Sequence, residues 1–196
     1  MKIINIKLFV ALSILIATMS CGGNEDVGIP KPHGYFRISM PENTYQIFDI
    51  KENSYTFEYS TIARVDERTD KPDENWINIF YPQHDATIYI TYHRIKNNLD
   101  AIVNDSHNFT YRHVIKADAI NESTYFFPDR NVFGLFVEVE GNAASPMQFL
   151  LTDSTKNFLR GSLYFNVEPN VDSIAPVLDF IREDVIRLIH TLKWKK

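Results

Sequence analysis

The sequence predicts an α+β fold in which an antiparallel β-sheet meander is covered by two helices. Two kinds of periodicity carry this prediction. Short segments in which every second residue is apolar, the pattern of strands, recur along most of the chain. Two longer segments, at about 98–113 and 174–192, instead repeat their apolar residues every three or four positions, as amphipathic helices do. Short turns join most consecutive strands, so the strands are expected to pair antiparallel.

The first strands are expected before the first helix. Alternating apolar residues predict one strand from about 34 to 40, where Pro41 stops it, and another over 55–59. A charged loop is expected over 64–75. A hairpin should follow, with strands at 76–81 and 86–93 joined by the Pro82–Asp85 connection.

The middle of the chain predicts a helix and then four strands. The helix is expected from about 98 to 113, because Leu99, Ile102 and Val103 share one helical face and Asn98 is a suitable N-cap. The segments between the four strands are rich in turn-forming residues, which favours a meander. The strands are expected at about 120–127, 132–140, 147–152 and 158–167.

The last helix has the clearest pattern, and we expect its apolar stripe to pack on the sheet rather than bind a partner. Asp172 or Ser173 is expected to cap its start, with Pro176 in the first turn, where a missing N–H is tolerated. The basic end, Lys193–Lys196, should complement the helix dipole. The stripe comprises Ile174, Val177, Leu178, Ile181, Val185, Leu188, Ile189 and Leu192.

Cys21 is the only cysteine in the chain, and it follows a short apolar run that begins after Lys7. A charged start, an apolar stretch and small residues at a cleavage site are typical of a secretory signal peptide. A cysteine at that site indicates a lipoprotein signal, so we expect lipid attachment at Cys21. An ordinary signal peptide is the alternative. A transmembrane helix needs about 20 apolar residues, and here the run is shorter, because Lys7 precedes it and the polar residues after Cys21 end it.

Three segments are therefore expected: a signal peptide over 1–20, a flexible tether over 21–33 and a single globular α+β domain over 34–196. The glycines and prolines of the tether prevent regular structure. A lipoprotein cysteine carries more than one acyl chain, which gives stable membrane anchoring. The formal net charge of −5 argues against a nucleic-acid partner, since nucleic-acid binders present a basic stripe.

The sequence offers no recognisable catalytic or metal-binding motif. The six histidines show neither a His-x-x-x-His nor a His-Glu-x-x-His pattern. No Gly-x-Ser-x-Gly elbow or phosphate-binding loop is present, and Ser145 and Ser154 lie in expected turns. A serine acting with His113 and Asp118 is a weaker hypothesis. We expect no catalytic residue, no metal site and no cofactor.

Four polar residues at turns or strand starts are candidates for contact with a partner: Asp118, Asp153, Lys156 and Arg160. The alternative is that they form a solvated surface or make structural hydrogen bonds, as aspartate often does in turns. Trp76 is expected to pack on the sheet rather than to bind a ligand.

Three stretches of the chain resemble a known family. The first is Pro30–Arg37, and the second joins Trp76–Ile79 with Ala86–Ile88. The third and longest comprises Lys116–Ile120, Leu151–Lys156, Phe158–Gly161, Leu163–Asn166 and Phe180–Asp184. With these stretches the chain resembles the gliding-motility lipoprotein GldD family over nearly all of its length after Cys21. The order of its elements also resembles the PsbP-like α/β sandwich, a fold used mostly for assembly or binding.

The resemblance implies a membrane-anchored envelope lipoprotein required for gliding, with machinery linked to type IX secretion and no known enzymatic reaction. Its partners would be the membrane, through the lipid anchor, and protein components of that apparatus. The membrane and the face that hold the anchor stay open. The alternative hypothesis is a small-ligand-binding or hydrolytic domain, which requires a deep pocket with convergent polar groups between sheet and helix.

Overall fold

Two antiparallel sheets and two helices make up the residues that the computed structural model describes, which are 40–68, 76–111, 117–167 and 171–195. All of them belong to the unit that spans Arg37–Lys196. The expected signal peptide, the tether and the strand expected over 34–40 fall outside the described residues, apart from Met40, which is irregular. The fold is α+β.

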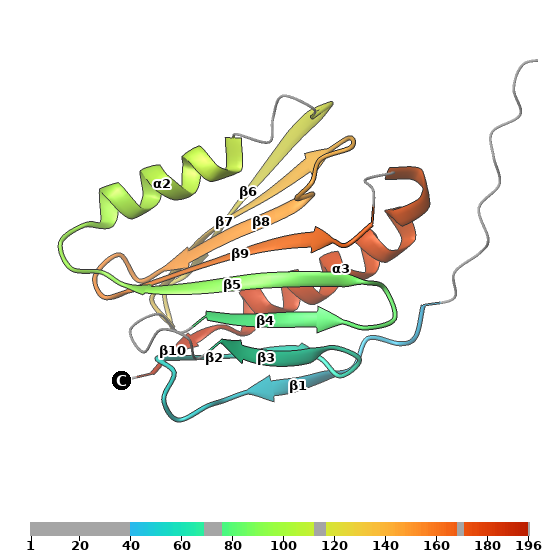
Figure 1. Cartoon of the computed structure of the whole chain (residues 1–196). Helices are drawn as coiled ribbons and strands as arrows, with labels where there is room; N and C mark the ends of the chain where they lie inside the picture. Colours follow the sequence, from blue (N-terminus) through green and yellow to red (C-terminus); the bar gives the residue numbers. More distant parts are fainter. Residues whose placement is uncertain (1–39, 69–75, 112–116, 168–170, 196) are drawn as a thin grey trace, which may run out of the picture. The chain divides into compact units, whose positions relative to one another are not determined.

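The larger sheet has seven strands in the order β3-β4-β5-β9-β8-β7-β6 (Figure 1). All of its neighbouring strands pair antiparallel. Its strands are β3 (Arg64–Arg68), β4 (Trp76–Tyr81), β5 (Ala86–Arg94), β6 (Ala119–Phe127), β7 (Val132–Glu140), β8 (Met147–Thr152) and β9 (Asn157–Phe165).

The structure confirms the β4–β5 hairpin and the four-strand meander β6–β9. The turns between them place Asp85, Asn131, Ser154 and Gly141 at positive φ, a conformation that Asn, Asp and Gly adopt more readily than most residues. The return connection from β5 passes through helix α2 (Leu99–Tyr111) to β6 at the far edge of the sheet. As a result β9, the last strand of the meander, pairs with β5 over its full length.

The expectation of a charged loop over 64–75 is wrong for its first part. Arg64–Arg68 form the edge strand β3, which pairs with β4 from Arg64↔Phe80 to Arg68↔Trp76. Only Val65 in this strand is apolar, and it packs at the margin of the core. An edge strand needs hydrogen bonds on one side only, and charged residues commonly protect such an edge from further pairing. Residues 69–75 lie outside the described part of the chain.

A second, three-stranded sheet joins the start of the described chain to its end. It consists of β1 (Tyr45–Phe48), β2 (Tyr55–Ser60) and β10 (Lys193–Trp194), in the order β1-β2-β10. The basic end at Lys193 was expected only to complement a helix dipole. Instead Lys193 pairs with Thr56 and Trp194 with Tyr55, and the Lys195 ammonium lies 2.6 Å from the Asp49 carboxylate.

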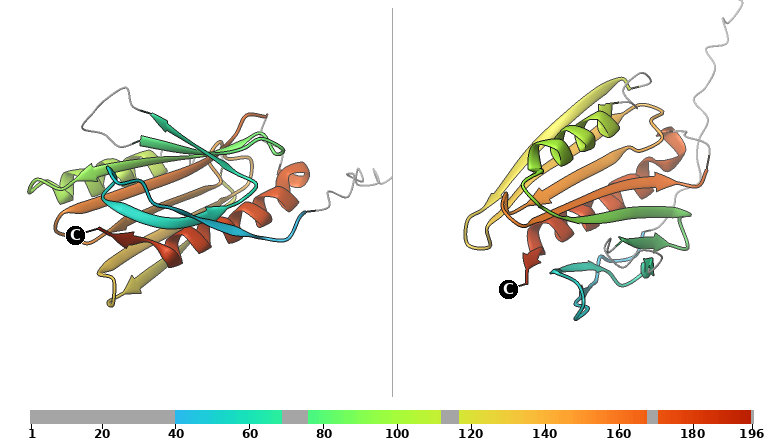
Figure 2. Two further views of the ribbon diagram at one scale, coloured as in Figure 1. Left: turned by 90° about the horizontal axis from the view of Figure 1, so that it is seen from below. Right: turned by 60° about the vertical axis from the view of Figure 1, so that its left-hand side comes forward.

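The two helices, α2 (Leu99–Tyr111) and α3 (Val171–Thr191), cover opposite faces of the larger sheet (Figure 2, right). Helix α3 begins before the expected caps, so Pro176 lies inside the helix, past its first turn. At the start of α2 the Asn98 carbonyl accepts from Ile102 N–H, while its side-chain oxygen accepts from Lys96 N–H rather than from the first turn. Residues 112–116, the end of the helix expected there, lie outside the described residues.

The main core lies between α3, the smaller sheet and the facing side of the larger sheet. The apolar stripe of α3 packs there, and Ile181, Ile189 and Leu192 are fully buried. The smaller sheet contributes stacked aromatic rings, with the Phe48 and Phe57 centroids 4.8 Å apart. The prediction that the α3 stripe packs on the sheet is therefore confirmed for every residue of the stripe except Ile174, which lies outside the core. In α2, by contrast, only Ser106 and Thr110 are buried, so that helix covers its face of the sheet loosely.

Candidate functional site

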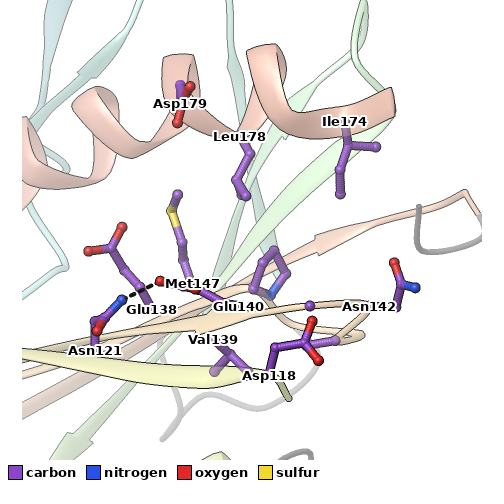
Figure 3. A pocket seen from close by; sticks show the side chains of 13 residues that line it. Asp118, Asn121, Glu138, Val139, Glu140, Asn142, Met147, Ile174, Leu178 and Asp179 are labelled. Carbon is purple, nitrogen blue, oxygen red and sulfur yellow. Dashed lines mark hydrogen bonds between the residues drawn. The ribbon is translucent and has the colours of Figure 1, made fainter. Parts of the chain in front are cut away.

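A cavity of about 600 Å³ opens between the first half of α3 and the ends of strands β6, β7 and β8 (Figure 3). Its volume falls within the range of ordinary ligand pockets. We call it the acidic pocket, because carboxylates are the only charged groups among the described residues that line it. It is lined by Asp118, Asn121, Glu138, Val139, Glu140, Gly141, Asn142, Ala143, Pro146, Met147, Ile174, Leu178 and Asp179.

The β7–β8 turn forms one wall of the acidic pocket. Gly141 begins this turn with φ of 94°, a left-handed conformation that favours glycine. A Cβ at this position would stand 2.8 Å from Asp118 Oδ2, so the absence of a side chain also leaves room for that carboxylate. The Asp118 N–H donates to the Glu140 carbonyl at 3.0 Å, which fixes the chain entering β6 against the end of β7.

The carboxylates of the acidic pocket differ in their partners. Glu138 pairs with the Arg182 guanidinium, whose Nε lies 2.6 Å from Glu138 Oε1. Glu140 Oε1 accepts from the Asn121 side-chain amide at 2.6 Å. The other three acidic residues, Asp118, Glu140 and Asp179, are exposed, and they form no ion pair with a described residue. The described lining of the acidic pocket therefore carries an excess of negative charge.

Apolar groups complete the pocket from both sides. Ile174 and Leu178 point from α3 toward the strands, and Met147 points from β8 toward the helix (Figure 3). A cationic group on an aliphatic stem fits such a mixture, because the stem can cover apolar surface while the charge meets carboxylates. Lysine and arginine side chains have this form. The described lining residues include no serine, cysteine or histidine.

The four polar residues chosen from the sequence occupy three separate places. Asp118 lines the acidic pocket. Asp153 and Lys156 lie in the β8–β9 turn, at the opposite end of β8 from Met147. Arg160 lies on the face of the sheet that α2 covers, at the margin of a second, smaller cavity. The structure therefore does not gather the four into one surface, and their role in partner contact stays a prediction.

Asp153 is a structural residue of its turn. Its Oδ1 accepts from the backbone N–H groups of Thr155, Lys156 and Asn157 at 2.7–2.9 Å, and its Oδ2 accepts from the Asn157 side chain at 2.6 Å. Burial raises the pKa of Asp153, but these donors outweigh burial and leave the pKa below its ordinary value. The neighbouring Lys156 side chain is exposed.

The structure also shows a buried carboxyl group that sequence reasoning overlooked. Asp184 of α3 is 1% exposed, and Tyr81 Oη donates to its Oδ2 at 3.0 Å. Burial raises the pKa of Asp184 to about 6, against the opposing effect of the hydroxyl groups of Tyr81, Ser60 and Tyr45. Position 184 lies three residues after Ile181 and four before Leu188, so the helical period itself placed it on the buried stripe.

The weaker hypothesis of a catalytic serine finds no assembled site among the described residues. Ser154 lies in the β8–β9 turn, at the far end of β8 from Asp118, and Ser145 is buried with its Oγ 3.4 Å from the Met147 carbonyl. His113 falls outside the described residues. The described residues contain no group of three or more metal-ligating side chains. Neither helix in the described part of the chain has the length and hydropathy of a membrane span.

Comparisons with known proteins identify a family and show similarity to solved structures. A family model described as gliding motility lipoprotein GldD matches residues 25–194. Among solved structures, the chain is similar to the solution structure of cyanobacterial PsbP (CyanoP) from Synechocystis sp. PCC 6803. That similarity has a TM-score of 0.44 at 11% identity and covers 78% of this chain and 97% of the other. No curated protein matches the chain.

Proposed function

The chain belongs to the gliding motility lipoprotein GldD family, and from this premise we propose that it is a non-enzymatic envelope lipoprotein. It supports the assembly or function of the gliding and type IX secretion machinery through protein contacts. The acidic pocket is the observation that carries this proposal, because it is a large concave site with excess negative charge at one end of the sheet. A basic side chain of a partner protein is the occupant that its chemistry fits.

Membrane attachment forms the second part of the proposal. Cys21 carries the lipid, and residues 21–33 form a short tether that keeps the domain near the bilayer. The support comes from the sequence around Cys21, which lies outside the described residues. Cys21→Ser should give protein that is unprocessed or soluble. Unchanged acylation and unchanged membrane fractionation of this variant would contradict lipid attachment at Cys21.

A photo-crosslinking amino acid at position 179 tests the contact in whole cells. Asp179 is exposed and lines the acidic pocket. Crosslinked products should contain components of the gliding or secretion apparatus, identified by mass spectrometry after gentle solubilisation. The control carries the same photo-crosslinking amino acid at position 52, which lies in an exposed turn between β1 and β2 and does not line the pocket. If positions 179 and 52 give the same products, the acidic pocket is not the contact site.

Charge removal tests the chemistry of the contact. The double variant Glu140→Gln with Asp179→Asn should weaken co-purification of the partner and lower secretion of type IX cargo, without loss of the membrane anchor. Glu42→Gln with Glu52→Gln removes the same charge from exposed residues outside the pocket and should change neither readout. If both double variants weaken co-purification and secretion equally, the loss comes from the lower net charge of the protein and not from the pocket.

A second candidate function is binding of a small cationic ligand in the same pocket. Its volume of about 600 Å³ favours this alternative, because drug-sized ligands occupy pockets of this size. Titration of the purified full chain with a free diamine such as putrescine separates the two functions. Saturable binding that depends on Glu140 and Asp179, together with no protein crosslink from position 179, would favour the small ligand.

A further inference from the structure

A second cavity, of about 60 Å³, lies between α2 and the face of the sheet opposite α3. We call it the α2 cavity. Its polar lining consists of hydrogen-bond donors and hydroxyl groups rather than carboxylates, the reverse of the acidic pocket. It is lined by Val103, Ser106, His107, Thr110, Tyr111, Leu135, Val137, Gln148, Phe149, Leu150 and Arg160.

The amide of Gln148 leaves one buried donor without an acceptor. Gln148 is 2% exposed, and its Oε1 accepts from Arg160 Nη2 at 3.1 Å. Arginine has no acceptor atom, so the oxygen of the amide must face Arg160 and the nitrogen must point elsewhere. That nitrogen, Nε2, is buried and has no hydrogen-bond partner in the described part of the chain. A buried donor without an acceptor is costly unless something supplies one.

Arg160 adds a cation that no carboxylate among the described residues neutralises. It forms no ion pair with another described residue, and its guanidinium instead lies over the Phe109 ring, 5.0 Å from the centroid. Burial lowers the pKa of Arg160, which reflects the cost of holding its charge out of water. An anion at this place would restore the electrostatic balance, because hydrogen bonds between guanidinium and carboxylate are strong and directional.

The remaining walls decide the kind of anion. Apolar side chains stand on both sides of the cavity, Val103 on α2 and Leu135, Val137 and Leu150 on the sheet, and an aliphatic group behind the anionic head suits them. The small volume suits a group of a few heavy atoms. A carboxylate on a short aliphatic chain satisfies the donors, the charge and the walls together.

We propose that the α2 cavity is a binding site for a short aliphatic carboxylate, with Arg160 and the Gln148 side-chain amide as the donors to its two oxygens. The carboxylate comes either from a free small acid or from the carboxyl terminus of a peptide. This site is separate from the acidic pocket, so the proposal stands independently of the partner contact described above.

Titration of the full chain with butyrate, followed by the ¹H–¹⁵N signal of the Gln148 side-chain amide, tests the proposal. Butyrate should shift this signal saturably, and butyramide, which has nearly the same shape without the charge, should not. Arg160→Gln should weaken butyrate binding at least about tenfold, the effect of losing one charged hydrogen bond. Arg94→Gln removes a charge from an exposed residue on β5 and should leave binding unchanged.

A second variant keeps the test decisive if Arg160→Gln fails to fold. Gln148→Glu places a carboxylate beside Arg160 within the chain, so it should raise the thermal stability and abolish butyrate binding. Because this variant lacks the Gln148 amide, binding is followed in it and in the wild type by the backbone ¹H–¹⁵N signals of the lining residues Val103 and Leu150. A short peptide with a free carboxyl terminus, compared with its amide, distinguishes the two sources. Binding of butyrate assigns the site to a free acid, and binding of the free-terminus peptide alone assigns it to a protein terminus. If neither binds, or if butyramide binds equally well, the proposal is wrong.

Discussion

Tyr81 on β4 and Asp184 on α3 form a hydrogen bond of 3.0 Å inside the core, where both residues are 1% exposed. Asp184 Oδ1 has no partner with hydrogen-bonding geometry among the described residues. A carboxylate in this position is poorly solvated, which is why burial raises its pKa to about 6. The folded state is therefore more stable with Asp184 protonated than with Asp184 ionised.

This pKa sets the direction of the pH dependence of stability. Unfolded Asp184 has its ordinary pKa of 3.8, so between that value and about 6 the folded state binds more protons than the unfolded state. The contribution of Asp184 to the free energy of unfolding is thus full below about pH 4 and is lost as the pH rises through 6. Asp184→Asn, which stays neutral, should stabilise the protein at pH 7 by up to about 3 kcal/mol.

Chemical denaturation of both proteins from pH 4 to pH 8 measures this effect. The gain from Asp184→Asn should shrink toward pH 4, while the control Asp179→Asn, on an exposed residue of the same helix, should show no such gain. If the difference in unfolding free energy between wild type and Asp184→Asn is the same at every pH, Asp184 does not titrate in this range.

Asp153 should behave in the opposite way. Asp153→Ala removes the acceptor of three backbone N–H groups in the β8–β9 turn and should lower the free energy of unfolding by about 2–3 kcal/mol. Because its folded pKa is depressed, the stability that the carboxylate supplies is present above pH 4 and lost as the pH falls through that depressed value. Urea denaturation at pH 7 measures the loss. Lys156→Ala, at an exposed residue of the same turn, should change stability by less than about 0.5 kcal/mol.

Gly161 is required because the ring of Phe149 lies against it. A Cβ at position 161 would stand 2.1 Å from Phe149 Cζ and 2.3 Å from Cε1, so Gly161→Ala should destabilise the domain by about 1–3 kcal/mol through overpacking. Phe149→Leu removes the obstructing ring. The double variant should therefore lose less stability than the sum of the two single variants, as measured in a double-mutant cycle. Simple additivity would show that the two residues do not compete for this space.

Arg130 holds the end of α3. Its Nη1 donates to the Leu192 carbonyl at 3.0 Å and also contacts the His190 carbonyl, and its guanidinium lies 4.2 Å from the Phe127 ring centroid. Carbonyl groups at a helix end have no partner within the helix, so Arg130→Ala should cost about 1–3 kcal/mol. Amide hydrogen exchange should rise in the last turn of α3 and in β10. Arg94→Ala, at an exposed arginine, should leave exchange there unchanged.

Much of the fold could be predicted from periodicity, because most strands and α3 bury one side only. The alternation of Ile77, Ile79 and Tyr81 identified β4 with its observed bounds. β3 escaped detection because an edge strand with one apolar residue resembles a charged loop. β10 could not be predicted, because a segment of two residues is too short to show an alternation of apolar and polar residues. Only its pairing with β2 in the folded protein makes it a strand.

The candidate sites could be predicted less well, because they depend on residues that tertiary contacts bring together. Asp118, Glu138 and Asp179 come from three separate parts of the chain, and nothing in their spacing indicates that they line one pocket. Asp118 and Arg160 were chosen for their place at strand starts, and each lies at a cavity, but at different ones. Asp184 could have been found, because its position on the apolar stripe of α3 was readable from the sequence.

The pairing of β10 with β2 imposes an order on folding. Tyr55 and Trp194 are neighbours in the smaller sheet although almost the whole domain lies between them in sequence. Bringing together residues so far apart in sequence costs loop-closure entropy, so such contacts form slowly. The edge of β2 therefore stays open on a ribosome or at a translocation pore until the last residues of the domain emerge. During that interval it is a natural place for a chaperone to bind, and a tag or fusion placed directly after Trp194 would compete for the same edge.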